Sequence, residues 1–185
     1  METIRRCAWA KGSQAMLDYH DREWGRPCHE DQSLFELLLL ESFQAGLSWA
    51  CVLHKRENFR RAMDGFAAEA IAQYDANRID QLMQDAGIIR CRRKLEAAVS
   101  NARIFLQMQK EFGSFDTYIW SFTDGKIVHT HNHGAPVSSE LSDRISKDLK
   151  KRGMKYVGTV IMYSYLQAAG IVDDHEEGCF CAQYE

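Results

Sequence analysis

The sequence has little that would interrupt helices, span a membrane or direct the chain out of the cell. Only two of its 185 residues are proline, so long helices can run without a break. The run of four leucines at 37–40 ends at Glu41, and no apolar stretch approaches the roughly 18 residues of a membrane span. The opening METIRRCAW has no apolar signal segment. We therefore expect a protein without membrane contact.

Cysteine is also too scarce to form the framework of the fold. The chain has six cysteines, and a domain of this length buries enough surface to fold without disulfide bonds. We expect reduced thiols and a cytoplasmic protein. The composition, with 45% hydrophobic and 26% charged residues, is that of one globular domain covering residues 1–185.

An overall excess of positive charge is missing. The 23 Lys and Arg residues are outnumbered by 26 Asp and Glu, which gives a net charge of −3 and argues mildly against nucleic-acid binding. Basic residues are nevertheless concentrated in two places. One is the segment 143–155, and the other is 90–94, where four of five residues are Arg or Lys. Local phosphate contacts remain compatible with this distribution.

Alternating strand patterns bounded by turns are absent as well, so the sequence predicts an all-α fold. A helix should start near Asp31, with Ser33 or Asp31 as its cap. Thr123 to Ser139 is the one long loop. Further amphipathic helices are expected at 48–63, 66–73, 78–86, 91–111, 115–121, 139–151 and 155–170.

Two pairs of metal-ligating residues lie at opposite ends of the chain. Twelve residues separate Cys7 from His20, and three separate His175 from Cys179. Zinc prefers four nitrogen or sulfur ligands, and such a site would join the two termini. Two alternatives stay open from the pattern alone. Cys181 can replace Cys179, and the histidines at 129, 131 and 133 can form a metal site of their own or simply be solvated.

An aromatic segment near the N-terminus carries one conspicuous acid. Trp9, Tyr19, Trp24 and Trp49 offer flat faces that suit stacking on a planar ligand, although each can also be an ordinary core residue. Glu41 follows the four leucines on a predicted helix. If it is buried it needs a cationic or hydrogen-bonding partner, and otherwise it is a surface helix residue.

A glycine turn joins two predicted helices near residues 78–105. Gly87 precedes the basic residues Arg90 and Lys94, and amides at the start of the second helix can bind a DNA phosphate. This arrangement predicts a helix-hairpin-helix. The alternative is a plain connecting turn with a solvated basic face.

Many short motifs occur together in one order over almost the whole chain. In this order the sequence resembles the 3-methyladenine DNA glycosylase I family of the helix-hairpin-helix DNA glycosylase superfamily. The motifs are CAW at 7–9, YHDREWG at 19–25, LFE at 34–36, ESFQAGLSW at 41–49, KREN at 55–58, DAGIIR at 85–90, KKRG at 150–153, YVG at 156–158, and His175 with Cys179.

The resemblance implies a monofunctional enzyme that hydrolyses the N-glycosidic bond of 3-methyladenine in alkylated double-stranded DNA and releases the free base. It implies a helical bundle and a structural zinc, and nothing in the sequence argues against a monomer. The zinc ligands would be Cys7, His20, His175 and Cys179. It assigns Glu41 as the catalytic residue and places Tyr19, Trp49, Trp9 and Trp24 in the base pocket. Gly46 and Leu47 would form a short wedge that fills the gap left in the duplex by the extruded base. Gly87, Arg90 and Lys94 would contact DNA.

One departure and two rival functions accompany this interpretation. Met16 stands where the family has a further pocket tyrosine. A zinc-stapled module that binds DNA or a modified base without cleaving it is the first rival, and a zinc protein that binds a protein partner is the second. Release of a base from methylated DNA separates the enzyme from both rivals, and the protein-binding rival would in addition have no DNA affinity at low salt.

Overall fold

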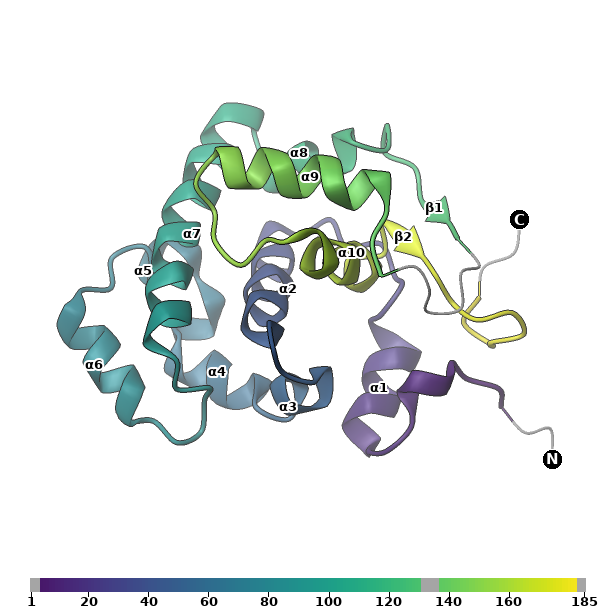
Figure 1. The fold of residues 1–185 in the computed structure, drawn as a ribbon, viewed down its shortest axis with the longest axis horizontal. Coiled ribbons are helices and arrows are strands. Elements are labelled where there is room, and N and C mark those ends of the chain that lie inside the picture. Colours follow the sequence, from purple (N-terminus) through teal and green to yellow (C-terminus); the bar gives the residue numbers. More distant parts are fainter. Residues whose placement is uncertain (1–3, 131–136, 183–185) are drawn as a thin grey trace.

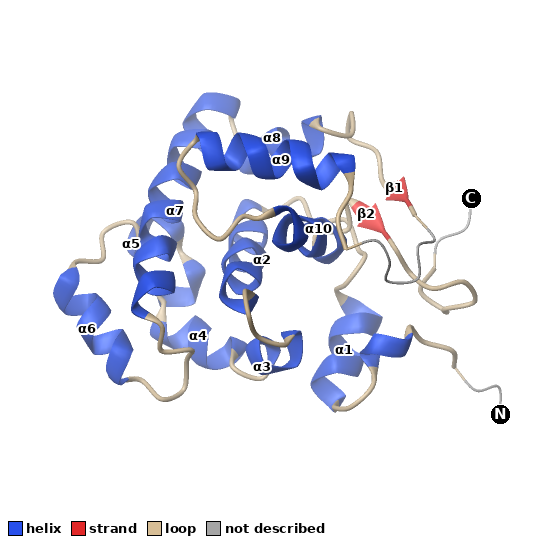
Figure 2. Cartoon of the chain, viewed as in Figure 1, coloured by secondary structure: helices blue, strands red, loops and turns tan. Residues whose placement is uncertain are grey.

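The computed structural model describes residues 4–130 and 137–182 as a bundle of helices (Figures 1 and 2). Two short 3-10 helices, at Ala8–Ala10 and Asp64–Phe66, accompany the α-helices. The α-helices are α1 (Gln14–Arg22), α2 (Asp31–Gln44), α3 (Trp49–Leu53), α4 (Arg56–Ala62), α5 (Ala68–Ile71), α6 (Ala76–Gln84), α7 (Arg92–Phe112), α8 (Phe115–Ser121), α9 (Glu140–Lys151) and α10 (Thr159–Ala168).

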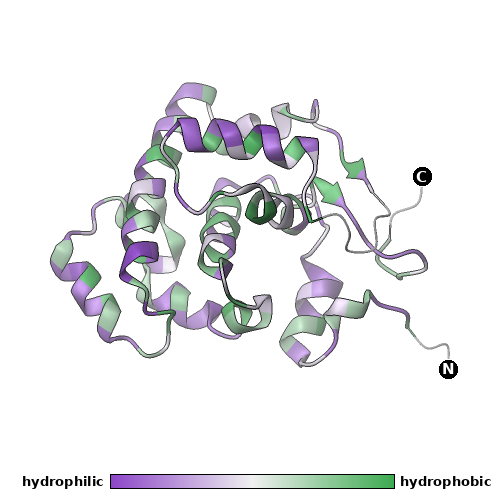
Figure 3. Cartoon of the chain, viewed as in Figure 1, coloured by the Kyte–Doolittle hydropathy of each residue, from purple (hydrophilic) through white to green (hydrophobic). Residues whose placement is uncertain are grey.

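Helix α2 occupies the centre of the bundle, with α7, α10 and α3 around it (Figure 1). Every residue from Leu34 to Phe43 is buried, so this stretch has no solvent face. Seven of these ten residues are Leu or Phe and they fall on every side of the helix, which favours a position inside the protein. Figure 3 shows the same apolar character along α2 and α10, whereas α9 alternates between hydrophilic and hydrophobic residues.

Several predicted helix boundaries need correction. The helix expected at 48–63 is two helices, because the chain turns at His54 and Lys55 between α3 and α4. The helix expected at 155–170 begins only at Thr159, since Tyr156 has a φ of 57° and Gly158 is extended. The cap residue of α2 is Glu30, and the Asp31 carboxylate instead accepts hydrogen bonds from the amides of Phe115 and Asp116 at the start of α8.

The all-α prediction is right for the bulk of the chain but misses a small sheet. Strands β1 (Val128–His129) and β2 (Val172–Asp173) pair in parallel, with Val128 opposite Val172. Two residues per strand are too few for an alternating pattern to be visible in the sequence. The sheet fixes the chain just before His175 and so helps to place the C-terminal segment beside the N-terminal one (Figure 1).

Glycine-containing turns join several successive helices, among them α6 with α7 and α9 with α10. In the second pair the two helices pack closely against each other, and α10 also packs on α2. Among the residues that the structure describes, no helix is long and apolar enough to cross a membrane.

Candidate functional site

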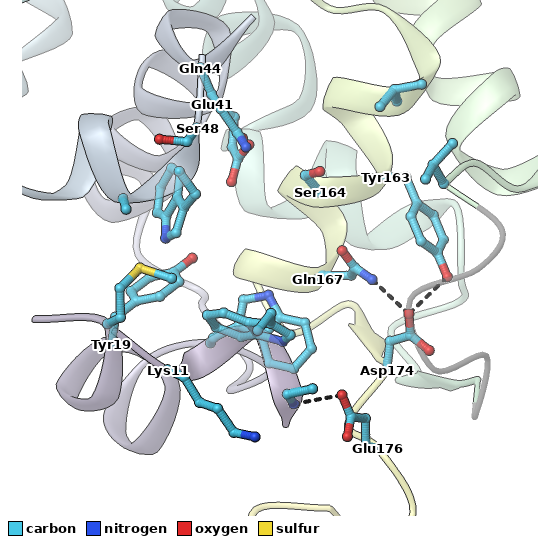
Figure 4. Close-up of a pocket in the computed structure, with 18 residues that line it drawn as sticks. Lys11, Tyr19, Glu41, Gln44, Ser48, Tyr163, Ser164, Gln167, Asp174 and Glu176 are labelled. Atoms are coloured by element: carbon cyan, nitrogen blue, oxygen red, sulfur yellow. Dashed lines mark hydrogen bonds between the residues drawn. The ribbon is translucent and has the colours of Figure 1, made fainter. Parts of the chain in front are cut away.

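A cavity of about 650 Å³ opens between α1, the end of α2, α3 and α10 (Figure 4). Glu41 and the four aromatic residues assigned to the base pocket from the sequence all line it, and so does Met16. The complete lining is Ala8, Trp9, Lys11, Met16, Tyr19, Trp24, Glu41, Gln44, Ser48, Trp49, Ala50, Val137, Val160, Tyr163, Ser164, Gln167, Asp174 and Glu176.

Aromatic rings form one end of this cavity. Trp9 stands edge-on to Trp24 with ring centroids 4.9 Å apart, and Tyr19 lies 5.0 Å from Trp49. These rings come from the first 3-10 helix, α1, the turn after α1 and the start of α3. Such an end suits a flat ligand, because aromatic faces stack on planar groups and attract positive charge.

Glu41 is buried at the same end of the cavity. Its side chain is 3% exposed, and its Oε2 atom has no hydrogen-bond partner among the described residues. Burial alone raises its pKa to about 8. Earlier on the same helix, the buried Glu36 accepts hydrogen bonds from Arg56 and Arg60 at 2.5 and 3.0 Å. The fold therefore satisfies one buried carboxylate on α2 and leaves the other facing the cavity.

Two more polar atoms near Glu41 are buried and unpartnered within the described chain. They are the hydroxyl of Tyr19 and the indole Nε1 of Trp49. Burial and the neighbouring Glu41 raise the pKa of Tyr19 well above its ordinary value, so the hydroxyl stays protonated. A carboxylate, a hydroxyl and an N–H donor thus face one space. Buried polar groups are normally paired, so this set is adapted to a polar, planar ligand.

The opposite end of the cavity was not predicted from the sequence. There the buried Asp174 accepts hydrogen bonds from Gln167 at 2.7 Å, Tyr163 at 3.3 Å and Thr130 at 2.8 Å (Figure 4). Tyr163 and Gln167 are four residues apart and so share one face of α10. The helical periodicity of 155–170 places Tyr163 and Gln167 on the same face. It does not indicate which face of this helix borders a cavity.

The turn at residues 45–48, called the wedge turn below, connects Gln44 at the end of α2 with Trp49 at the start of α3, and both of these residues line the cavity. Gly46 has a φ of 78°, a conformation that favours glycine, and Leu47 exposes 43% of its surface. Ser48 then caps α3 by accepting a hydrogen bond from the amide of Cys51. An exposed apolar side chain therefore lies between Gln44 and Ser48, two residues that line the cavity, and its role as a wedge stays a prediction.

The four predicted metal ligands come together next to this pocket. Cys7, His20, His175 and Cys179 are all buried, and their ligand atoms lie within 4.8 Å of one another. Cys7 Sγ is 3.5 Å from His175 Nδ1, and Cys179 Sγ is 3.4 Å from His20 Nε2 and 3.6 Å from His175 Nδ1. In a zinc tetrahedron sulfur and nitrogen ligands lie about 3.5 Å apart, given bond lengths of about 2.3 and 2.0 Å.

Surrounding groups hold the two histidines in place. His20 Nδ1 lies 2.8 Å from Asp21 Oδ1, and Arg6 bonds the same carboxylate and lowers its pKa to about 2. A carboxylate behind the imidazole is the usual second partner of a metal-bound histidine. Gly25 is required on the other side, because a Cβ there would lie 2.7 Å from His175 Nε2.

The sequence left two alternatives to this metal site, one with Cys181 and one with the histidines at 129, 131 and 133. Cys181 lies outside the group of four and belongs to a separate, less buried set with His20 and Asp21. None of the six cysteines, all within the described residues, forms a disulfide bond. His129 is 3.3 Å from Asp173, whereas residues 131 and 133 lie outside the described residues.

The DNA contacts expected near residues 78–105 lie on α6, the following turn and the start of α7. Arg90 is exposed. The Gly87 amide already donates to Asp85 Oδ1 at 2.7 Å, and its carbonyl accepts from Lys55 and Asn58. Lys94 points inward and donates to the carbonyls of Phe43 and Ala45. A phosphate at Gly87 or Lys94 would have to compete with these bonds.

The fold and the pocket define a helical protein whose partly open cavity suits a planar, positively charged ligand. The sequence profile of the methyladenine glycosylase family matches residues 9–182. DNA-3-methyladenine glycosylase 1 of Escherichia coli strain K12 is 44% identical over 181 residues, covering 96% of this chain and 97% of the relative. The DNA-3-methyladenine glycosylase of Haemophilus influenzae is also 44% identical, over 179 residues, 95% of this chain and 97% of its own.

Solved structures of proteins with the same name are also similar to this chain. A crystal structure of 3-methyladenine DNA glycosylase I, 44% identical, superposes with a TM-score of 0.93 over 97% of this chain and all of the other. The Staphylococcus aureus enzyme, solved to explain 3-methyladenine recognition, is 36% identical with a TM-score of 0.93 over 98% of both chains. The chain belongs to the methyladenine glycosylase family.

Proposed function

We propose that this protein excises 3-methyladenine from alkylated double-stranded DNA by hydrolysing the N-glycosidic bond. The observation that carries the proposal is Glu41, buried at the aromatic end of the cavity with its Oε2 atom unpartnered within the described part of the chain. The names of the relatives point the same way, and the Staphylococcus aureus structure concerns recognition of that base. The protein is therefore assigned as an N-glycosyl hydrolase.

The pocket favours a methylated base through charge. A base inside a duplex must be extruded to reach the cavity, at a cost of a few kcal/mol. 3-Methyladenine in DNA is cationic, and its arrival beside Glu41 favours loss of the carboxyl proton. The anion and the faces of Trp49 and Tyr19 then attract the cation, whereas neutral adenine would leave Glu41 buried without a partner.

The reaction needs little further assistance from the protein. The departing base leaves as a neutral molecule, so its glycosidic bond is already weakened, and water takes its place on the sugar. Lys11 is the one lysine in the cavity lining, and its exposed chain points away from Tyr19 and Glu41 (Figure 4). We therefore assign monofunctional chemistry, with an abasic site left in an uncut strand.

The duplex is held by the wedge turn and by basic residues. Leu47 is assigned to the space that the extruded base vacates, supported by its exposure on the turn between the cavity-lining residues Gln44 and Ser48. Arg90 is assigned as a phosphate contact. The α9–α10 turn is a second candidate grip, because Lys150, Lys151 and Lys155 are exposed around it and α10 itself lines the cavity.

We also propose that Cys7, His20, His175 and Cys179 bind one structural zinc ion. The sulfur-to-nitrogen distances of 3.4–3.6 Å match a tetrahedral site, and both cysteines are buried where a metal would explain their proximity. Zinc would join the two terminal segments and supply no chemistry to the reaction. One complete pocket per chain supports action as a monomer, and the cytoplasmic location stays a prediction.

The activity is tested by incubating the protein with methylated DNA and identifying released bases by chromatography. The wild type should release 3-methyladenine without strand breaks. Glu41→Gln should lower the rate by about 100-fold or more, as loss of one stabilising group at a reacting charge commonly does. The exposed Glu69→Gln is the matched control and should behave as wild type. Absence of any released base, or an unchanged rate in Glu41→Gln, would overturn the proposal.

A further inference from the structure

Lys94 occupies an unusual position for a basic residue. It lies in the first turn of α7, where the helix dipole disfavours positive charge and where no acidic residue is present. Its side chain is half-buried, and burial lowers its pKa. The ammonium group leaves α7 and donates to the carbonyls of Phe43 at 2.8 Å and Ala45 at 2.6 Å.

Those two carbonyls belong to the end of α2. The last carbonyls of a helix have no partner within it and carry partial negative charge, so an ammonium group is a favourable cap. Directly after them come Gly46 and the exposed Leu47, with the Leu47 amide donating to the Gln44 carbonyl at 2.6 Å. Lys94 therefore fixes the base of the wedge turn.

The same lysine also faces the turn between α9 and α10. Its Nζ atom lies 5.9 Å from the ring centroid of Tyr156, whose backbone has a φ of 57°. Asn101, further along α7, exchanges hydrogen bonds of 2.9 Å with the backbone of Lys155. Through Lys94 and Asn101, helix α7 thus contacts both the wedge turn and the turn between α9 and α10.

We propose that Lys94 is a positioning residue for base extrusion: it holds the Phe43 and Ala45 carbonyls and so fixes Leu47 in the orientation that enters the duplex. This inference rests on the proposed glycosylase function. It replaces the expectation that Lys94 contacts phosphate, because its donors are already used inside the protein. Lys94 touches neither the base nor the sugar.

Lys94→Met tests the proposal by keeping the apolar stem and removing the ammonium group. Single-turnover excision from methylated DNA should fall by about 10- to 100-fold, since a misplacement of about 1 Å can cost about 100-fold. Binding of free 3-methyladenine, followed by tryptophan fluorescence, should be unchanged because the pocket residues stay in place. Lys110→Met, at an exposed lysine near the end of α7, is the matched control and should behave as wild type.

The salt dependence of DNA binding separates positioning from a phosphate contact. Removal of one phosphate contact lowers the slope of log Kd against log salt by about 0.9, whereas substitution of a positioning residue leaves it unchanged. A reduced slope with a normal excision rate would overturn the proposal. If wild-type protein binds DNA but releases no base, the glycosylase function fails instead. The fluorescence of a 2-aminopurine placed in the DNA, compared between wild type and Lys94→Met on binding, then still reports whether Lys94 acts on extrusion.

A double-mutant cycle with Leu47→Ala provides the second test. If Lys94 acts through Leu47, Lys94→Met should have little additional effect on excision in the Leu47→Ala background, because the group it positions is already missing. Fully additive effects would show that Lys94 acts elsewhere and would overturn the proposal. Lys94→Arg, which retains a charged donor group, should restore most of the rate and guards against a folding defect in Lys94→Met.

Discussion

At the scale of single residues, the two buried acids of α2 show how one helix serves both stability and function. Glu36 is neutralised by Arg56 and Arg60, so its charge is accommodated within the protein. Glu41 has no such cation, and its pKa is raised to about 8 by burial. A protein that only needed a stable core would gain from an apolar residue there. Under the proposed function, the cationic base would supply the charge that Glu41 lacks.

Glu41 should make the ligand-free protein less stable as the pH rises. Its pKa is about 8 when folded and about 4.5 in an exposed reference state, so unfolding releases a proton between these values. Stability therefore falls as pH increases from about 4.5 to about 8. Glu41→Gln removes this contribution, and its melting temperature should exceed that of wild type by more at pH 8 than at pH 5. An equal difference at both pH values would contradict the raised pKa.

At the scale of elements, the α6–α7 and α9–α10 helix pairs have turns with different surroundings. The α6–α7 turn is largely bonded to its own neighbours, with Asp85 occupying the amide of Gly87. The α9–α10 turn is ringed by exposed lysines, and no side chain caps the start of α10 at Gly158. Since α10 also contributes Tyr163 and Gln167 to the cavity, a phosphate held at this turn would be placed in a defined relation to the pocket.

Salt-dependent binding should distinguish the two hairpins. Replacing Lys151 and Lys155 together by Met should weaken binding to all DNA sequences alike and reduce the salt slope by about 0.9 for each phosphate that the two lysines neutralise. Arg90→Ala should reduce the slope by about 0.9 at most, because it removes one cation. Fluorescence anisotropy at several salt concentrations measures both, with Lys110→Met as control. A slope that falls only in Arg90→Ala would place the main grip at α6–α7.

At the scale of the whole molecule, the cysteine–histidine cluster connects the chain termini to the pocket wall. Trp9 lies 5.4 Å from His20, and Trp24 lies 4.6 Å from His175, both as ring-centroid distances. Two pocket aromatics therefore pack directly against two of the candidate ligand residues. A metal at this point would support one side of the pocket as well as the fold.

Zinc binding is tested by comparing Cys179→Ser with Cys181→Ser. Purified wild-type protein should contain about one zinc ion per chain by elemental analysis, as one tetrahedral site requires. Cys179→Ser should lose zinc and melt at a lower temperature, by about 2–4 °C for each kcal/mol of stability lost in a chain of this size. Cys181→Ser should retain both properties. A full zinc content in Cys179→Ser would shift the ligand to Cys181.

The sequence alone determined the helical class, because its apolar periodicity and scarcity of proline are local properties. Its ordered motifs also singled out the cysteine–histidine quartet and the pocket set around Glu41, which the structure brings together. It did not determine what Lys94 and Gly87 bind, nor that Asp174 lies at the far end of the cavity. Those depend on which distant segments face one another, and burial, hydrogen-bond partners and pKa values follow from that arrangement rather than from residue order.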